Sequence, residues 1–297
     1  MRATPSAVRR LLALTAAVFL FAVVAAVGAA PISADPVTGT DANGTYLALG
    51  DSVAFGFVPA EAVPAPNYHD AHSFLGYPEF LAQQLNERVT NASCPGETST
   101  SMLVAGAPSN GCENLPGSPT GYRTLFPLHA EYQGTQMEYA LHYLAAHKHT
   151  RLVTIGVGAN DLFLCAETTQ DGCRSPLELL GVATAISTNL TRMFEEIRGT
   201  GYQGPIVVLT YYSLSYTDPA QLQTAGFLDS VLESATSLNG GIVADGFDAF
   251  ARPSAAFVGD PCAAGLLIKL PDGTCNIHPS PAGQRLLAAA IAEAIGA

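Results

Sequence analysis

Apolar and polar residues alternate along the chain in blocks that predict short strands separated by helices. Residues 151–157 (RLVTIGV) and 205–210 (PIVVLT) are rich in β-branched side chains and contain no acidic residue. Such runs are typical of parallel strands that are covered on both faces. Residues 46–49 (YLAL) form a similar run near the start, and residues 88–92 and 255–258 are weaker strand candidates.

Five segments between these runs have the apolar spacing of helices. They are residues 78–86, 135–147, 176–198, 219–238 and 281–295. Several begin with proline, whose missing N–H costs nothing at a helix start. Strands that alternate with helices predict an α/β fold with a central parallel sheet and right-handed crossovers. Ligands of such sheets bind at the carboxyl ends of the strands.

The beginning of the chain has the character of an export signal. Three arginines among the first ten residues precede an apolar run from Leu11 to Val27, and the small residues 28–30 close it. This order predicts a signal peptide over residues 1–30 and a secreted protein. An uncleaved membrane anchor is the alternative, because the run approaches the roughly 20 residues that a bilayer requires. The alanine-rich end favours cleavage.

The rest of the chain has the composition of one folded domain. Residues 31–44 are rich in Pro, Gly, Thr and Asp, which predicts a linker. Residues 45–297 contain no repeat and no second block of distinct composition. The 48% of hydrophobic residues can supply a core. The net charge of -12, from 13 basic and 25 acidic residues, would repel a phosphate backbone, so no nucleic-acid partner is expected.

Six cysteines form three pairs that are close in sequence. The pairs are Cys94 with Cys112, Cys165 with Cys173, and Cys262 with Cys275. An even number of cysteines behind an export signal predicts disulfides, and the short spacings favour this sequential pairing. The first two pairs lie in residues 93–134 and 159–175, which we predict to be long loops. The absence of a Cys-x-x-Cys motif counts against a zinc ribbon, and we expect no metal and no cofactor.

A serine and a histidine stand where they could perform nucleophilic chemistry. Ser52, in Gly50-Asp51-Ser52, directly follows the strand candidate 46–49, so we expect it at the ligand-binding edge of the sheet. His278 lies in Asn-Ile-His-Pro-Ser, just before the last predicted helix. A neutral imidazole there could act as a general base. Taken alone, Gly-Asp-Ser is also ordinary turn sequence.

Two further residues could stabilise an oxyanion. Asn160, in Gly-Ala-Asn-Asp, follows the strand run 151–157, and its amide could donate a hydrogen bond at the same edge. Gly96, in Cys-Pro-Gly-Glu-Thr, follows the strand candidate 88–92, and its N–H could join that of Ser52. Each motif alone also fits a turn. Asp51 and Asp161 are expected to bond backbone groups rather than act as acid or base.

These four elements, in this order, resemble the sequence blocks of the SGNH (GDSL) family of serine esterases and lipases, including its disulfide-bearing secreted actinobacterial members. The resemblance extends over nearly all of residues 45–297. It implies a flavodoxin-like three-layer α/β/α sandwich, ester hydrolysis without a required metal, and signature positions Ser52, Gly96, Asn160 and His278. No Gly-x-Ser-x-Gly motif occurs, which counts against the α/β-hydrolase fold as an alternative serine enzyme.

One position departs from the family pattern. The family commonly has an aspartate three residues before the histidine, and this chain has Cys275 there. Asp272 could curl back to hold the Nδ1–H of His278. We favour a backbone carbonyl, because a Cys262–Cys275 disulfide would pin this loop and leave position 275 without charge.

The expected function is that of a secreted serine hydrolase that cleaves carboxylic esters of lipids or of short acyl groups. A carbohydrate O-deacetylase is the alternative, and it would need a polar, open cleft. Tyrosines in residues 211–216 could line either kind of cleft. A non-catalytic extracellular binding module of the same fold is the third possibility. The partner implied is a small-molecule or lipid ester, and no stable protein partner is implied.

Overall fold

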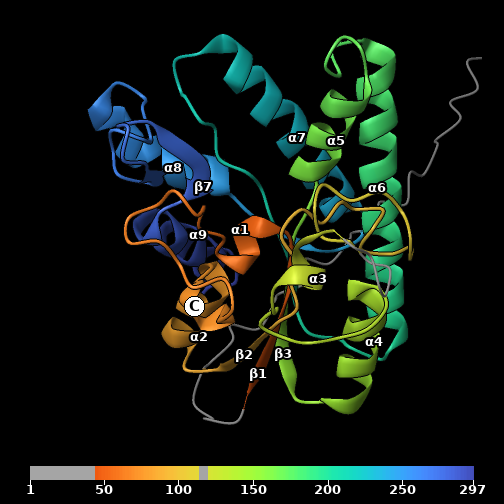
Figure 1. Cartoon of the computed structure of the whole chain (residues 1–297). Coiled ribbons are helices and arrows are strands. Elements are labelled where there is room, and N and C mark those ends of the chain that lie inside the picture. The colour runs from red at the N-terminus through yellow and green to blue at the C-terminus, as the bar shows by residue number, and fades with distance from the viewer. Residues whose placement is uncertain (1–43, 114–119) are drawn as a thin grey trace, which may run out of the picture. The chain divides into compact units, whose positions relative to one another are not determined.

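The strands of the described residues that form the central sheet are all parallel, in the order β2-β1-β3-β4-β5 (Figure 1). They are β1 (Thr45–Gly50), β2 (Arg88–Asn91), β3 (Thr150–Gly156), β4 (Ile206–Leu209) and β5 (Ile242–Ala244). This is the order of a flavodoxin-like sheet. The four predicted strands that begin at residues 46, 88, 151 and 205 are therefore confirmed.

The structure is a computed structural model that describes residues 44–113 and 120–297, all within one unit, Ala34–Ala297. The predicted signal peptide and all but the last residue of the predicted linker lie outside the described residues. Among the helices that it describes, none is long and apolar enough to cross a membrane.

Helices cover both faces of the sheet, as Figure 1 shows with the sheet between them. One face packs against α4 (Gln136–Ala146), α6 (Pro176–Gly199) and α7 (Pro219–Leu238). The other face packs against α2 (Tyr77–Leu85), α8 (Gly246–Ser254) and α9 (Pro281–Ala294). The predicted three-layer α/β/α sandwich is confirmed.

Side chains of the central strand β1 alternate between these two layers. Leu47 and Leu49 belong to the core under α4, α6 and α7, whereas Tyr46 and Ala48 belong to the core under α2, α8 and α9. All four are fully buried. Because successive strand residues point to opposite faces, a strand buried on both faces must be apolar at every position. This explains the uninterrupted YLAL run.

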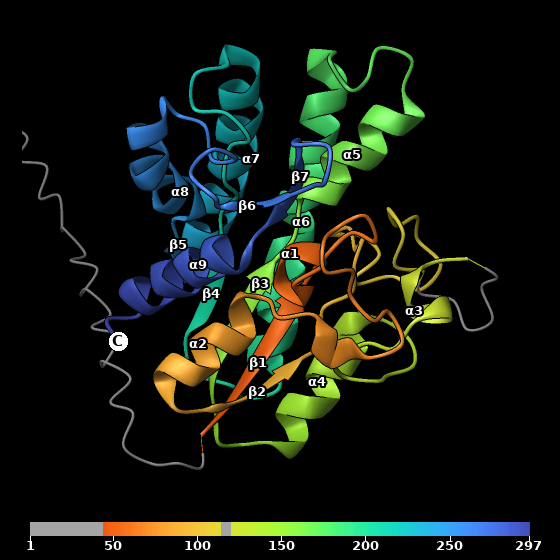
Figure 2. The same cartoon turned by 60° about the vertical axis from the view of Figure 1, so that its left-hand side comes forward.

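Shorter elements complete the fold. They are α1 (Ser52–Phe55), the 3-10 turn η1 (Ala71–Ser73), α3 (Tyr122–Leu125), α5 (Ala159–Thr168), the 3-10 turn η2 (Ala255–Phe257), and an antiparallel pair of strands, β6 (Leu267–Lys269) and β7 (Cys275–Pro279). Figure 2 shows β7 beside α1, beyond the carboxyl ends of the central strands. The strand β7 contacts α1 directly.

Two sequence predictions about local structure are wrong. The proposed strand at residues 255–258 is the turn η2, which continues α8 and ends where Val258 is left-handed (φ 56°) and exposed. The fifth strand is instead the short β5. The proposed loop at 159–175 contains the helix α5. Its Asn160-Asp161 pair suggested a turn, but an acidic residue is also favourable in the first turn of a helix.

The structure contains the three expected disulfides. Cys94–Cys112 closes the loop after β2, Cys165–Cys173 joins the end of α5 to the segment before α6, and Cys262–Cys275 anchors the start of β7. The Cys94–Cys112 bridge therefore stabilises the loop after β2, and the Cys262–Cys275 bridge stabilises the strand that carries His278.

Candidate active site

Ser52 occupies the first position of α1, immediately after β1. The turn between them is held by Asp51, whose backbone N–H donates to the Gly156 carbonyl at 3.0 Å. Its carboxylate Oδ1 accepts from the Val53 N–H at 2.8 Å and caps the helix. Ser52 remains partly exposed. The local sequence thus presents one hydroxyl at the carboxyl edge of the sheet.

His278 reaches this hydroxyl from β7. Its Nε2 lies 2.9 Å from Ser52 Oγ, although 226 residues separate them. The ring also packs against Phe57, with ring centroids 4.9 Å apart. Burial lowers the pKa of His278 to about 4. The imidazole is therefore neutral at neutral pH, and a neutral Nε2 can accept the serine proton.

The group that orients His278 is the side chain of Asn276. Its Oδ1 lies 2.5 Å from His278 Nδ1 and also accepts from the His278 backbone N–H at 3.1 Å. A backbone N–H can only donate, so the atom that faces both groups must be the amide oxygen. Nδ1 therefore carries the ring proton, and Nε2 presents its lone pair to Ser52.

This arrangement corrects both expectations about Nδ1. The acceptor is neither a backbone carbonyl nor Asp272, whose carboxylate instead accepts from the N–H and hydroxyl of Thr274 at 2.9 and 2.7 Å. Asn276 escaped prediction because the family pattern directs attention to the third residue before the histidine. The available signal was Asn-x-His itself, since asparagine commonly bonds the backbone N–H two residues on.

Two consecutive tyrosines after β4 bond the residues next to Ser52 and His278. The Tyr211 hydroxyl donates to Asp51 Oδ2 at 2.5 Å, and the Tyr212 hydroxyl donates to the Ile277 carbonyl at 2.6 Å. The Tyr216 hydroxyl donates to the Phe247 carbonyl at 2.7 Å. The three hydroxyls that could have lined a substrate cleft are thus engaged inside the protein.

Gly96 and Asn160 follow the two strands that flank β1. Cys94 N–H donates to the Gly50 carbonyl at 3.0 Å, which holds the Gly96 loop beside the nucleophile turn. Among the described residues, no acceptor is bonded to the N–H of Ser52 or of Gly96. Asn160 Nδ2 donates to Asp51 Oδ2 at 3.3 Å. The strand order therefore brings the three expected oxyanion donors to neighbouring positions at one edge.

The two acidic residues expected to bond backbone groups do so. Asp51 caps α1, and Asp161 accepts from the Ser99 N–H at 2.8 Å. Burial raises the pKa of both carboxyls to about 6. Asp161 therefore ties the loop that contains Gly96 to the helix that carries Asn160.

Gly96 is expected to tolerate no side chain. Its φ of +86° is left-handed, and a Cβ there would collide with the backbone of Asn110 and Gly111. Gly172 is a matched control, because its φ is +71° but nothing lies within 4 Å. We expect Gly172→Ala to cost about 1 kcal/mol of stability, the ordinary strain of a left-handed residue, with activity retained. Gly96→Ala should cost more in stability and also reduce the ester hydrolysis that the family resemblance implies.

Denaturant melts and initial rates of both variants measure these effects. Equal losses in the two variants would contradict the close packing of the Gly96 loop.

Among the residues that the structure describes, two groups of cysteine and glutamate side chains have the proximity of metal ligands, but their cysteines cannot supply thiolates to a metal ion. Within the described ranges these are Cys94, Glu97 and Cys112, and Cys165, Cys173 and Glu178. The cysteines of both groups are paired in disulfides, and the thiolate is the form that binds metals.

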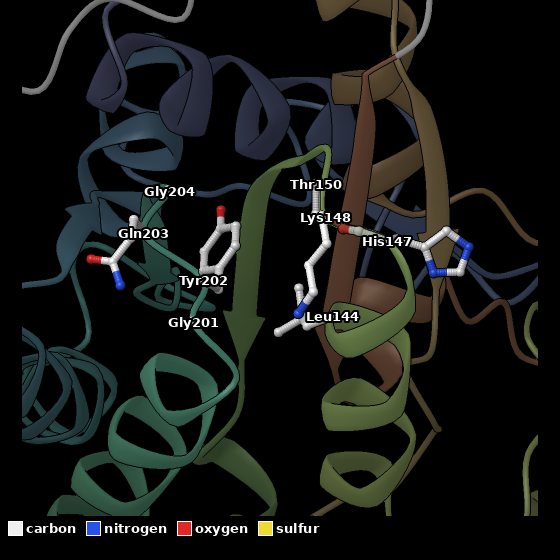
Figure 3. A pocket seen from close by; sticks show the side chains of 8 residues that line it. All are labelled: Leu144, His147, Lys148, Thr150, Gly201, Tyr202, Gln203 and Gly204. Atoms are coloured by element: carbon white, nitrogen blue, oxygen red, sulfur yellow. The ribbon is translucent and has the colours of Figure 1, made fainter.

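A separate hollow of about 250 Å³ lies at the opposite edge of the sheet, where β3 begins (Figure 3). It is lined by Leu144, His147, Lys148, Thr150, Gly201, Tyr202, Gln203 and Gly204. The Tyr202 hydroxyl donates to the Pro205 carbonyl at 2.9 Å. None of the candidate catalytic residues lines this hollow, so it is not part of the site.

The flavodoxin-like sheet, with a serine hydroxyl hydrogen-bonded to a histidine at its carboxyl edge, is the arrangement of an α/β enzyme with an activated serine nucleophile. Residues 48–286 match the model of the GDSL-like Lipase/Acylhydrolase family. The chain belongs to this family of ester hydrolases.

Solved structures share the fold at low sequence identity. A catalytic variant of Axe2, an acetylxylan esterase from Geobacillus stearothermophilus, is 16% identical, with a TM-score of 0.52 over 86% of this chain and 94% of its own. A protein assigned as a GDSL-like lipase from Parabacteroides merdae is 15% identical, with a TM-score of 0.52 over 85% and 95%. No curated protein matches the chain. At these identities the likeness shows the fold.

Proposed function

We propose that the chain hydrolyses carboxylic esters through an acyl-enzyme on Ser52. The observation that carries the proposal is the hydrogen-bonded series Ser52 Oγ, His278 and Asn276 Oδ1, with distances of 2.9 and 2.5 Å. A nucleophile in contact with a base that is oriented by a third group is the signature of an activated serine.

In the acylation step, His278 Nε2 takes the Ser52 proton while Oγ attacks the ester carbonyl carbon. The carbonyl oxygen becomes an oxyanion, which the N–H groups of Ser52 and Gly96 and the Asn160 amide stabilise. The C–O bond to the alcohol then breaks, and His278 gives its proton to the departing alkoxide. Deacylation repeats the sequence: His278 takes a proton from water, the hydroxide attacks the acyl carbon, and Ser52 leaves with that proton.

Asn276 serves this cycle without a negative charge. Its Oδ1 holds the Nδ1–H of His278 through both proton transfers, so the ring keeps the productive tautomer. The imidazolium that forms is stabilised by an amide dipole, not by a carboxylate. The low pKa of His278 agrees with a ring that has no charged partner.

The proposed substrates are esters of lipids or short acyl groups. A carbohydrate O-deacetylase is the second candidate, suggested by the acetylxylan esterase among the proteins of similar fold. A non-catalytic binding module would not need the Ser52–His278 contact, which counts against that reading.

Hydrolysis of p-nitrophenyl esters of graded acyl length, beside an acetylated xylo-oligosaccharide, tests the proposal. We expect release that disappears in Ser52→Ala, since no other described hydroxyl contacts His278 Nε2. A preference for long acyl chains supports a lipase, and a preference for the acetylated sugar supports the deacetylase. Equal rates in the parent and in Ser52→Ala would contradict the proposal.

We also propose that the protein is exported. The order of basic, apolar and small residues over 1–30 and the three disulfides support this proposal. N-terminal sequencing of the protein recovered from culture medium tests it. Recovery only from the membrane fraction, with residue 1 retained, would contradict it.

A further inference from the structure

The carboxylate of Asp51 joins groups that follow three different strands. Asp51 follows β1, Asn160 follows β3, and Tyr211 follows β4. Asp51 Oδ2 accepts from Asn160 Nδ2 at 3.3 Å and from the Tyr211 hydroxyl at 2.5 Å. The residue is 1% exposed. Among the ion pairs of the described residues, none includes Asp51, so these hydrogen bonds are what compensates its burial.

Helix capping does not account for this environment. The cap on α1 uses only Oδ1, which accepts from the Val53 N–H. Serine or asparagine at this position would cap as well. The second carboxylate oxygen has two donors of its own, and both come from outside α1.

The Asn160 amide is held at both of its ends. Its Oδ1 accepts from Asn110 Nδ2 at 3.1 Å, and its Nδ2 donates to Asp51. Asn110 belongs to the loop that Cys94–Cys112 closes, and its backbone N–H donates to the Gly96 carbonyl at 2.7 Å. One short loop therefore holds Gly96 and also contacts Asn160.

These two contacts decide which way the amide faces. An amide turned by 180° would place its oxygen against the Asp51 carboxylate and its NH₂ group against the Asn110 NH₂ group, and both pairings are repulsive. In the observed orientation one N–H is bonded to Asp51. The second N–H donates to no group among the described residues, so it is the one available to an oxyanion.

We propose that Asp51, Tyr211 and Asn110 are positioning residues that hold the Asn160 amide as an oxyanion donor. Tyr211 acts indirectly, because its hydroxyl fixes the Asp51 Oδ2 atom that accepts the hydrogen bond from Asn160 Nδ2. This inference rests on the proposed serine-esterase function.

The test uses Tyr211→Phe, which removes one hydroxyl from the network. Tyr202→Phe is the matched control, since its hydroxyl also donates a single hydrogen bond but lies at the opposite edge of the sheet. Loss of an oxyanion donor costs about 10²- to 10³-fold in kcat. We therefore expect Asn160→Ala to lose about 10²-fold and Tyr211→Phe about tenfold, each with KM changed less than about twofold.

A double-mutant cycle separates positioning from general weakening. If Tyr211 acts through Asn160, Tyr211→Phe will cause no further loss of kcat in the Asn160→Ala background. Asp51→Asn and Asn110→Ala are expected to show the same non-additivity. Tyr211→Phe leaves the Asp51 cap of α1 in place. This variant therefore tests the positioning of Asn160 even if Asp51→Asn fails to fold.

Three outcomes would overturn the inference: a Tyr211→Phe loss equal to that of Tyr202→Phe, a loss in KM alone, or a full additional loss in the Asn160→Ala background. Ser52→Ala is assayed in parallel. Equal rates in Ser52→Ala and the parent would contradict the proposed function and this inference with it. A Ser52-dependent rate that Tyr211→Phe leaves intact would contradict this inference alone.

Discussion

Alanine at position 278 is expected to lower kcat for a p-nitrophenyl ester by about 10⁴-fold or more, as is alanine at position 52. Among the described residues, His278 is the base that contacts Ser52, and its Nε2 lies 2.9 Å from Ser52 Oγ. A serine hydroxyl without its base is a weak nucleophile at neutral pH. The residual rate should reflect binding and the oxyanion donors alone.

The double variant Ser52→Ala/His278→Ala is expected to lose no more than either single variant, because the two groups act as one unit. His142→Ala is a suitable control, since His142 is exposed on α4. Initial rates under saturating ester measure kcat for the parent and the four variants. Losses that multiply in the double variant would contradict a shared role, and a loss in His142→Ala would indicate a general effect of removing histidine.

Changes at Asn276 are expected to have the second largest effect. Asn276→Ala removes the acceptor of the His278 Nδ1–H, so the proton can move to Nε2 and block the serine. We expect kcat to fall by about 10²- to 10⁴-fold, up to the loss seen when a catalytic histidine takes the wrong tautomer. Asn276→Asp keeps both oxygen contacts and should retain a rate near that of the parent at pH 8.

The aspartate variant should differ in its pH profile. Burial lowers the pKa of His278 to about 4, so the active, neutral ring persists in the parent until the pH approaches that value. A negative charge at position 276 stabilises the imidazolium and raises this pKa. The acid limb of kcat/KM in Asn276→Asp should therefore lie at higher pH than in the parent.

Profiles of kcat/KM from pH 4 to pH 8 measure this shift. Asp272→Asn is the control, because Asp272 bonds Thr274 and not the imidazole. An acid limb that moves in Asp272→Asn but not in Asn276→Asp would show that the acceptor at Nδ1 has been misidentified.

Burial of His278 also has a consequence for stability. Its pKa is lower in the folded protein than the usual value near 6.5 of the unfolded chain. The unfolded state therefore binds the proton first, and this group's contribution to stability falls as the pH drops from about 6.5 toward 4.

Local sequence alone was enough for the elements with strong patterns. The runs that became β1, β3 and β4 are mostly apolar and contain no acidic residue, because both faces of a central strand are covered. The helix α7 begins and ends at the predicted residues, Pro219 and Leu238. The strand β5 was not predicted, since a three-residue strand at the side of the sheet is too short to show a periodic pattern of apolar residues.

The sequence also indicated which residues lie close together at the site. Ser52, Gly96 and Asn160 each follow a strand, and parallel strands end at one edge, so their proximity follows from topology. The order of the motifs along the chain is that of the family whose model the chain matches. The disulfides of the structure are likewise the sequential pairs that short spacing along the chain favoured.

Only the tertiary structure decided how these residues are oriented. The acceptor at His278 Nδ1, the hydroxyl of Tyr211 on Asp51, and the amide of Asn110 on Asn160 are contacts between side chains. Two of them join residues that are 160 and 50 positions apart. Hydrophobic periodicity reports which face of an element is buried, but not where a polar atom on that face finds its partner. That choice depends on distances of a few tenths of an ångström, which arise only when the packed layers bring separate strand ends together.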